Sequence, residues 1–397
     1  KIIPLGGLDG IGKNMTVFEC GDDMVLVDAG LMFPDDSQPG IDLVLPDYTY
    51  VLENEEKLRG IIVTHGHEDH TGSLPYLLQD LNNKVPIFSS KLTLGFIEGK
   101  LSEFRIRAPK FREVKGGSHV NLGGISLDFF SMTHSIPGAL GVFIRTNQGT
   151  VMHTGDFKLD QTPIDGVTPD YAAISALPAG IDLLLSDSTN ATVPGFTKSE
   201  AEVGPNLLHA IKNARVAVRA SFSSHIHRLQ QICDAARKCG RKVVVTGRSM
   251  LTNTRVAREL GYLNIDDADI IDAFDIDNLP DDKIVVMCTG SQGEPLSALS
   301  RMANGEHKTL SIHEGDTVIL SATPVPGNEK AVQQVVNSLA KLGCDVWDKN
   351  RALVHVSGHG SQEELKLLMA MAKPTYFMPV HGEAVHLRAH AQLARKM

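Results

Sequence analysis

The most constraining feature of this sequence is the hexapeptide HGHEDH at positions 65–70, which directly follows a short apolar run. It places four potential metal ligands, His65, His67, Asp69 and His70, within six residues. A tight loop at a strand end can direct His65 and His67 to one cation, and the later pair to a neighbouring cation. Imidazole and carboxylate groups suit Zn²⁺ and also accept Mn²⁺. The hexapeptide therefore predicts a metal site built on the end of a β-strand.

Further ligands must come from other parts of the chain, and three candidates stand at the ends of other apolar runs. They are His134 in MTHS, Asp156 in HTGD and His381 in PVHG. A carboxylate between two cations can bridge them, and we expect Asp156 to do so. Asp28, which ends another apolar run, is placed to orient either a ligand or the metal-bound water from behind. The set predicts a centre with two cations.

The first half of the chain consists of short apolar runs separated by glycine-rich turns. Short strands at this density, with polar loops at their ends, favour a β-sandwich with helices outside. The predicted helices are residues 74–80 and 200–214. The predicted strands are residues 24–27, 60–64, 125–130, 142–145, 150–152 and 181–185.

The pattern changes near residue 206, where strands and helices begin to alternate. Alternating βα units predict a parallel sheet covered by helices. Near the C-terminus, two more predicted strands, 353–356 and 375–378, each end in a histidine loop like those of the first half. We therefore expect an α/β fold in which a first domain (1–200) is interrupted by an inserted domain (201–349) and completed by residues 350–397. The alternating elements are strands 216–218, 242–246, 284–288 and 317–321 and helices 226–238, 252–260 and 328–342.

Composition excludes several classes of protein. With 397 residues and 42% hydrophobic content, the chain is long enough for two or three domains. No run approaches about 18 apolar residues, so we expect no membrane span, and the N-terminus lacks the layout of a signal peptide. The five cysteines are scattered and form no CxxC pair, which disfavours a disulfide framework and predicts a cytoplasmic protein.

Charge is distributed unevenly along the chain. The net charge of −9 for the whole sequence argues against a nucleic-acid binder. Residues 206–260, however, contain eleven lysines and arginines and only two acidic residues, a net charge of +9 against −18 for the rest. This asymmetry predicts a basic face able to steer a polyanion. The alternative is a stretch of ordinary solvated helix surface.

The order of motifs resembles a known superfamily. VDAG at 27–30, then HGHEDH, a histidine and an aspartate resemble the metallo-β-lactamase superfamily. SDSTN at 186–190, His359 in SGHGS and His381 resemble motifs A, B and C of its β-CASP nucleases, whose RNA-directed members carry histidine at motif C. The resemblance implies a four-layer αβ/βα sandwich with a β-CASP α/β domain inserted between motifs A and B. Segments that are together similar to the ribonuclease J family are LGGLDGIGKN (5–14), VDAGLMFP (27–34), SFSSHIHR (221–228), TGSQGEP (289–295) and PGNE (326–329).

For the active site, the resemblance implies two Zn²⁺ ions bridged by Asp156. It also implies that His359 is the proton donor to the leaving 3′ oxygen, with Asp187 stabilising its imidazolium form. Without the resemblance, a structural hydrogen bond in a turn would be the simpler interpretation of His359. The implied zinc ligands are His65, His67 and His134 for one ion, and Asp69, His70 and His381 for the other.

Small polar residues in two parts of the chain predict an RNA-binding subsite. Backbone N–H groups and hydroxyls in such turns can bind a phosphate. His355, Ser357 and His359 alternate along one predicted strand end and therefore share a face. The alternative role for the serines at 221, 223 and 224 is helix capping before Ile226. Positions that hold RNA near its 5′ end in ribonuclease J correspond here to Ser224, His225, Ile226, His355, Ser357, Gly358 and His359.

Two further features follow from the resemblance. Gly40 and Asp42 match a structural Ca²⁺ site found in some family members. Members of the family normally continue into a C-terminal domain that helps them to oligomerise, and we expect that domain to be absent from this chain. We expect the full-length protein to be a homodimer or a higher oligomer.

The implied function is a zinc-dependent ribonuclease with endonucleolytic and 5′→3′ exonucleolytic activity on single-stranded RNA, in rRNA processing and mRNA decay. Hydrolysis by a metal-activated water would leave a 5′-phosphate, and 5′-monophosphorylated RNA would be preferred. Two alternatives are a small-molecule metallohydrolase acting on lactams, esters or thioesters, and a catalytically idle scaffold in RNA decay. The basic insertion and His359 argue against the first alternative, and the complete set of ligands argues against the second.

Overall fold

The computed structural model describes residues 1–34, 38–82, 84–107, 109–176, 180–294, 296–324 and 328–397. Of the sequence motifs given above, Pro295, Pro326 and Gly327 lie outside the described residues. Contacts divide the chain into two compact units. Unit 1 comprises residues 1–161, 166–197 and 358–397, and unit 2 comprises residues 162–165 and 198–357. The first unit is thus interrupted by the second and completed by the C-terminal segment, while the domain limits given above remain a prediction.

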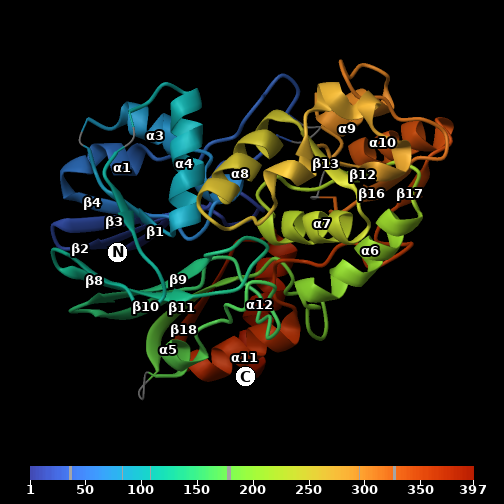
Figure 1. Ribbon diagram of the computed structural model, residues 1–397. Helices are drawn as coiled ribbons and strands as arrows, with labels where there is room; N and C mark the ends of the chain where they lie inside the picture. The colour runs from blue at the N-terminus through green and yellow to red at the C-terminus, as the bar shows by residue number, and fades with distance from the viewer. Residues whose placement is uncertain (35–37, 83, 108, 177–179, 295, 325–327) are drawn as a thin grey trace. The chain divides into compact units, whose positions relative to one another are not determined.

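Unit 1 contains two six-stranded sheets, with helices on their outer faces (Figure 1). The first sheet has the order β1 (Ile2–Gly6), β2 (Met15–Cys20), β3 (Asp23–Val27), β4 (Leu58–Ile62), β5 (Ile87–Ser89) and β6 (Phe111–Glu113). The second has the order β18 (Pro374–Val380), β11 (Ile181–Asp187), β10 (Gly149–His153), β9 (Leu140–Thr146), β8 (Ile125–Ser131) and β7 (His119–Leu122). The helices of unit 1 are α1 (Thr49–Glu53), η1 (Glu55–Lys57), α2 (Glu68–Thr71), α3 (Leu74–Asp80), α4 (Lys91–Glu103), α5 (Tyr171–Ser175), α11 (Gln362–Ala372) and α12 (Ala384–Lys396).

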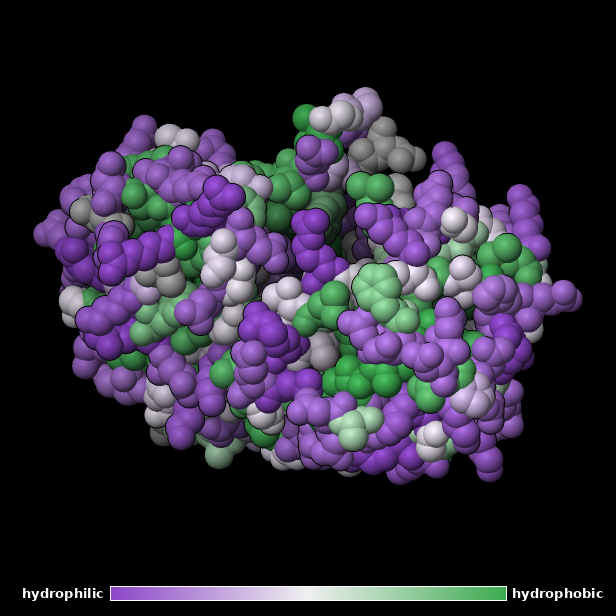
Figure 2. All heavy atoms as spheres, turned by 45° about the horizontal axis from the view of Figure 1, so that its top comes forward, coloured by the Kyte–Doolittle hydropathy of each residue, from purple (hydrophilic) through white to green (hydrophobic). Residues whose placement is uncertain are grey.

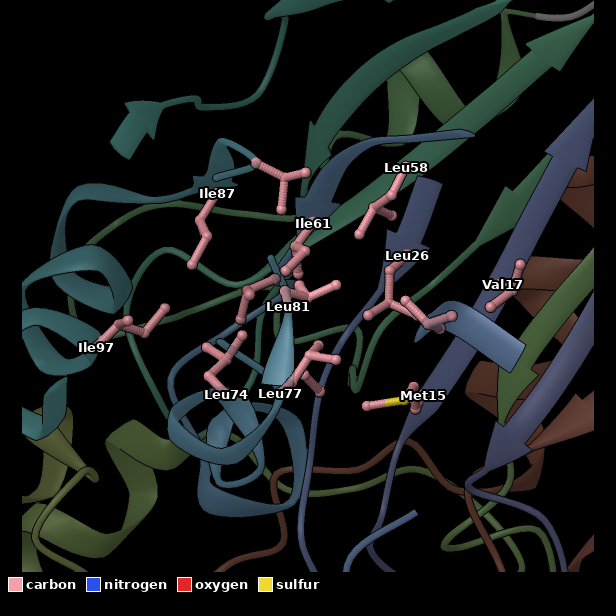
Figure 3. Packing of buried hydrophobic residues seen from close by; sticks show 14 of the residues in the cluster. Met15, Val17, Leu26, Leu58, Ile61, Leu74, Leu77, Leu81, Ile87 and Ile97 are labelled. Carbon is pink, nitrogen blue, oxygen red and sulfur yellow. The ribbon is translucent and has the colours of Figure 1, made fainter. Parts of the chain in front are cut away.

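Strand β3 shows how the layers of unit 1 are held together. Its side chains Met24 and Leu26 pack into a cluster with Leu74 of α3. Leu26 and Leu74 are labelled in Figure 3. The intervening Val25 and Val27 pack instead into a second cluster, shared with β8 and β9 of the other sheet. Because a strand alternates its side chains between two faces, a strand buried on both faces must be apolar at every position. A third cluster joins the second sheet to α5 and α11.

Unit 2 is a single parallel six-stranded sheet, with α9 and α10 on one face and α6 and α7 on the other (Figure 1). Its order is β14 (Ile270–Ile271), β13 (Lys242–Thr246), β15 (Ile284–Cys288), β12 (Ala217–Ala220), β16 (Thr317–Leu320) and β17 (Asp345–Trp347). The helices of unit 2 are η2 (Glu200–Glu202), α6 (Val203–Asn213), α7 (Ile226–Lys238), α8 (Arg248–Glu259), η3 (Asp267–Asp269), η4 (Ala273–Asn278), η5 (Asp281–Lys283), α9 (Ala298–Ala303) and α10 (Glu329–Lys341).

The sandwich and the inserted α/β unit confirm the predicted fold class. The predicted strand at 353–356 is wrong, because residues 353–357 form no regular secondary structure. The carbonyl oxygen of Val354 accepts hydrogen bonds from the side chains of Arg228 and Ser321, and not from a neighbouring strand. Helix α4 was missed, since Gly95 and Gly99 lower the helix propensity of its sequence.

The surface seen in Figure 2 is mostly hydrophilic, with scattered hydrophobic residues. Among the residues that the structure describes, no helix is both long and apolar enough to cross a membrane.

Candidate metal centre

The candidate ligands all belong to unit 1, where they follow the carboxyl ends of strands. The HGHEDH segment begins three residues after β4, and its second half forms the short helix α2. His134 follows β8, and Asp156 follows β10. His381 comes directly after β18, in a left-handed backbone conformation with φ of 54°.

Three histidines converge through one ring nitrogen each. The Nδ1 atom of His67 lies 3.0 Å from Nε2 of His65 and 3.1 Å from Nε2 of His134. The other nitrogens are engaged elsewhere: Nδ1 of His134 donates to the carbonyl of Gly358 (2.7 Å), and Nδ1 of His65 lies 3.1 Å from the Thr64 hydroxyl. The three converging nitrogens form a group with the spacing needed to hold one metal ion.

A second group is formed by Asp69, His70, Asp156 and His381. The Oδ2 atom of Asp156 lies 3.2 Å from Nε2 of His70 and 3.3 Å from Nε2 of His381. Asp69 completes the group, with its Oδ2 atom 3.6 Å from each of the same two nitrogens. The Nε2 atom of His381 is buried and has no hydrogen-bond partner in the described part of the chain, as expected of a nitrogen that faces a metal ion.

Asp156 stands between the two groups. Its Oδ2 atom lies 3.8 Å from Nε2 of His65 and 3.9 Å from Nε2 of His134, in addition to its contacts with the second group. Only 3% of the residue is exposed, so this charge is held away from water. A buried carboxylate oxygen within 4 Å of nitrogens from both groups has the position of a bridging ligand.

Two polar side chains fix the orientation of ligands in the second group. Asp28 Oδ2 accepts a hydrogen bond from Nδ1 of His70 (2.7 Å), in the role expected from the sequence. Asn14 Oδ1 accepts one from Nδ1 of His381 (3.0 Å), and Asn14 Nδ2 donates to the carbonyl of Asp69 (3.1 Å). The contacts at Nδ1 direct Nε2 of both rings to the centre, where Nε2 of His70 also lies 3.1 Å from Asn14 Nδ2. Asn14 was not predicted; its only signal was its place at the end of the LGGLDGIGKN segment.

The electrostatics of the centre suit metal ligation. Burial holds the pKa of His65 and His134 well below the usual value, and lowers the pKa of His67 to about 4. Neutral imidazoles are the form that binds a metal. Burial also lowers the pKa of His70, but the carboxylate of Asp156 and its acidic neighbours reverse this and raise it well above the usual value. The three histidines of the first group are therefore in the form that binds a metal, and the acidic surroundings of His70 favour a cation at the second group.

His359 lies beside the centre and is paired with a buried carboxylate. Its Nδ1 atom donates to Oδ2 of Asp187 (2.7 Å) and lies 4.0 Å from Oδ2 of Asp156. The backbone carbonyl of His359 accepts hydrogen bonds from Asn190 Nδ2 (2.9 Å) and Thr197 Oγ1 (2.7 Å), so the turn itself is fixed. Burial lowers the pKa of His359, but Asp187 more than offsets this and raises it to about 9. The imidazolium form is thus favoured.

The residues predicted to bind RNA are divided between the two units. Gly358 and His359 belong to unit 1, and the other five belong to unit 2. Ile226 is fully buried as the first residue of α7, and its backbone N–H donates to the carbonyl of Ser224 (2.9 Å). The N-cap of α7 is His225, whose Nδ1 accepts from the backbone N–H of Arg228 (3.4 Å). The alternative role of a serine as the cap is therefore wrong.

The candidate calcium residues show no ligand cluster. Gly40 and Asp42 are both exposed, and Gly40 has a φ of 82°. Within the described part of the chain, Asp42 belongs to none of the groups with metal-ligand spacing.

The positive charge of residues 206–260 is largely neutralised within unit 2, so the predicted basic face does not hold for these residues. Three of its arginines, Arg219, Arg228 and Arg241, are buried. Many of the acidic partners lie between residues 266 and 316, outside the segment 206–260. The net charge of that segment alone therefore overstated the positive charge left unpaired at the surface. The pairs are Arg215 with Asp281 and Asp316, Arg237 with Asp266 and Asp269, Lys242 with Asp269, Arg255 with Glu259, and Arg258 with Asp267.

Gly30, in the VDAG motif, is required by a close backbone approach. A Cβ atom at this position would lie 1.5 Å from the carbonyl oxygen of Asp69 and 2.8 Å from the backbone nitrogen of His70. We expect Gly30→Ala to displace this part of the ligand loop, to reduce bound metal and to destabilise the fold by about 1–3 kcal/mol, as overpacking usually does. Elemental analysis and thermal unfolding measure both effects.

Gly124→Ala is the matched control, because its Cβ atom would meet its nearest neighbour, Asp23 Oδ2, at an ordinary 3.5 Å. Full metal content and unchanged stability in Gly30→Ala would contradict the close approach described here.

Comparison with known proteins agrees with this geometry. The metallo-β-lactamase superfamily model matches residues 8–190, the ribonuclease J β-CASP domain matches residues 213–339, and the RNA specificity domain of Zn-dependent metallo-hydrolases matches residues 349–397. A protein of unknown function from Enterococcus faecalis V583 has a solved structure that matches with a TM-score of 0.71 over 98% of this chain and 95% of that chain. At 16% identity, this match shows the shared fold alone.

Curated relatives share much more of the sequence. Ribonuclease J of Mycolicibacterium smegmatis is 47% identical over 99% of this chain and 71% of its own length. Ribonuclease J of Thermus thermophilus is 47% identical over 100% of this chain and 70% of its own length, and ribonuclease J2 of Bacillus subtilis is 42% identical over 100% and 71%. The family implies metal binding and RNA binding. The chain therefore belongs to the ribonuclease J family, the β-CASP ribonucleases of the metallo-β-lactamase superfamily.

Proposed function

We propose that this protein is a zinc-dependent ribonuclease that cuts single-stranded RNA internally and also degrades it in the 5′→3′ direction, leaving 5′-phosphates. The observation that carries the proposal is the position of Asp156 Oδ2, between two groups of ligands and beside the His359–Asp187 pair. Five histidines and two carboxylates form the ligand set, and this nitrogen-rich chemistry favours Zn²⁺.

In this proposal, each group of ligands holds one ion, and Asp156 is shared between them. When bound, two divalent cations supply an activated water and neutralise charge on the phosphoryl oxygens. Thr64, Asp28 and Asn14 keep the ligand rings oriented through the contacts described above. Gly358 does the same for His134, because its carbonyl holds the Nδ1 proton of that ring.

His359 would supply the proton that the leaving 3′ oxygen requires. Asp187 accepts from Nδ1, which assigns the donated proton to Nε2. Asp187 is itself held by the backbone N–H (2.9 Å) and the hydroxyl (2.7 Å) of Thr189, so the pair keeps its orientation. Breaking the bond between phosphorus and the 3′ oxygen leaves phosphate on the downstream RNA, which explains the proposed 5′-phosphate product.

Product lengths test the proposal. A 5′-labelled single-stranded RNA should yield both labelled mononucleotide and shorter labelled oligonucleotides. Chelation should stop both reactions, and Zn²⁺ should restore them. Hydrolysis of nitrocefin or of a thioester without any cleavage of RNA would overturn the proposal in favour of a small-molecule hydrolase. Full metal content without turnover of any substrate would favour an idle scaffold.

We further propose that the protein acts in the cytoplasm, in rRNA processing and mRNA decay, and that the full-length protein is a homodimer or a higher oligomer. The five free cysteines are consistent with a reducing compartment. Gly40 and Asp42 remain the proposed calcium residues.

The 5′ end of the RNA should control the exonucleolytic reaction. Every shortened product carries a 5′-monophosphate, and small donors at Ser224, His225, Ser357 and Gly358 are proposed to bind it. We expect mononucleotide release to be fastest from 5′-monophosphate RNA, because a triphosphate is too bulky and a hydroxyl offers no charge. Ser357→Glu should abolish this preference by like-charge repulsion and spare internal cleavage. Rates are measured on one RNA made with the three different 5′ ends.

Ser249→Glu is the matched control, since Ser249 is an exposed residue of α8 in the same unit. Equal mononucleotide release from all three RNAs by the unsubstituted protein would refute the proposed phosphate subsite.

A further inference from the structure

Unit 2 contains a buried group of charged side chains that the proposed mechanism does not use. Arg219 of β12 and Arg228 of α7 are both 0% exposed, and Glu200 of η2 is 5% exposed. Arg228 binds Glu200 in a bidentate pair, with Nη2 donating to Oε2 (2.7 Å) and Nε donating to Oε1. One carboxylate therefore faces two guanidinium groups, and the group carries an excess positive charge.

Arg219 is the arginine whose charge is left without a partner. Its Nη2 atom donates to the hydroxyl of Ser321, but its Nε and Nη1 atoms are buried and have no hydrogen-bond partner among the residues that the structure describes. A guanidinium keeps its proton at neutral pH, even where burial disfavours the charge. A buried cation without a compensating anion is strongly unfavourable, and this arrangement therefore favours the arrival of an anion nearby.

The group is bonded to both turns of the proposed phosphate subsite. Arg228 Nη1 donates to the hydroxyl of Ser321 (3.0 Å) and to the carbonyl of Val354 (2.9 Å). Val354 directly precedes His355 in the chain. On the other side, the backbone N–H of Arg228 donates to His225, whose Nε2 atom lies 3.5 Å from Oε2 of Glu200. Arg219 itself lies two residues before the segment 221–224, which includes Ser224.

The histidines of the subsite do not supply positive charge. Burial, assisted by Arg228, lowers the pKa of His225 to about 4 and that of His355 to about 3. Both rings are therefore neutral at physiological pH and act as hydrogen-bonding groups. The attraction for a phosphate dianion must then come from the arginines behind them.

We propose that Arg219, with Arg228 and Glu200, is a positioning and specificity-determining group for the 5′-monophosphate: the excess guanidinium charge attracts the dianion, and the hydrogen bonds to Ser321 and Val354 fix the turns that bind it. This inference rests on the proposed phosphate subsite and assigns the source of its charge. The proposed role of Arg219 differs from a purely structural role because it depends on the net charge of the group. That net charge can be lowered or raised by substitution.

The test uses two nearly isosteric substitutions with opposite expected effects. Arg219→Met removes the excess charge, and Glu200→Gln increases it while keeping an acceptor for Arg228. The readout is the ratio of kcat/KM for 5′-monophosphate RNA to that for 5′-hydroxyl RNA. We expect a fall of at least about tenfold for Arg219→Met and a rise for Glu200→Gln, because a unit charge acting on one negative charge over about 10 Å at an effective dielectric constant of about 20 already contributes about a factor of ten.

Arg241→Met is the matched control. Arg241 is also buried, but it donates to the backbone carbonyls of Ala214, Arg215 and Ile284, away from both turns. Its loss should lower stability and leave the ratio unchanged. A fall in the ratio for both Arg219→Met and Glu200→Gln would identify a structural role and overturn the proposal. If Arg219→Met fails to fold, the direction of change in Glu200→Gln still decides, because a structural role predicts a fall and the proposal predicts a rise.

Equilibrium binding separates this inference from the proposed function. Uridine 5′-monophosphate and uridine are compared as ligands of the unsubstituted protein and of each variant, without any cleavage step. Equal binding of the two ligands by the unsubstituted protein would refute the proposed phosphate subsite itself. Tighter binding of the monophosphate that persists in Arg219→Met would leave the subsite intact and refute the role of Arg219.

Discussion

Asp156→Asn should lower RNA cleavage at least about 10³-fold, because a Lewis acid contributes several kcal/mol to such a reaction and about 1.4 kcal/mol is a factor of ten. The substitution keeps the shape of the side chain but removes the charge of the one oxygen that approaches both groups of ligands. Both metal ions should therefore be weakened. Elemental analysis of the purified protein should show about two ions per chain before the substitution, as a dinuclear centre requires, and fewer than one after it.

Two further variants define the bridging role. His134→Ala should mainly affect one ion, because His134 belongs to only one group. Asp182→Asn is the matched control, since Asp182 is an exposed residue of β11 outside the centre. If Asp156→Asn retains both turnover and metal, or if the active protein holds a single ion, Asp156 does not bridge.

His359→Ala should retain both metal ions and RNA binding but lower the cleavage rate by roughly 10²–10⁴, the usual contribution of a positioned general acid. His359 also belongs to a group with Asp156, Asp187 and His381 that has metal-ligand spacing, so metal content decides between the two roles. An RNA with a 3′-bridging sulfur has a leaving group of low pKa that needs no proton, and it should be cleaved by the variant at much nearer the unsubstituted rate.

His119→Ala serves as the control, because His119 is an exposed histidine of β7 paired with Asp128 on the surface. A slow rate that the sulfur substrate does not restore, or the loss of a metal ion from His359→Ala, would exclude His359 as the proton donor.

Local sequence determined those helices and strands whose formation depends only on residues nearby in the chain. The helix at 226–238 and the strands at 242–246 and 284–288 were predicted with the limits that the structure has. Their apolar periodicity is set by neighbours a few residues away. The ligand loop at 65–70 could also be predicted from the sequence, because its four metal-ligating side chains lie within six consecutive residues after a strand.

Tertiary structure decided what depends on distant partners. Asn14 lies 367 residues from His381, whose ring it orients, and no local pattern marks that pair. The segment at 353–356 has the apolar alternation of a strand, but the side chains of Arg228 and Ser321 take the carbonyl that a neighbouring strand would need. A local pattern cannot show which group will satisfy a backbone carbonyl.

The distribution of charge shows most clearly the difference between what the sequence determined and what the tertiary structure decided. The sequence determined that residues 206–260 are basic, and from this it predicted an exposed face for a polyanion. The fold buried Arg219, Arg228 and Arg241 and paired most of the others with acidic groups that lie largely outside the segment. Coulomb interactions depend on distance and burial in space, not on distance along the chain. The sequence by itself therefore determined the fold class and the candidate ligands, and only the tertiary structure decided which charges remain without partners.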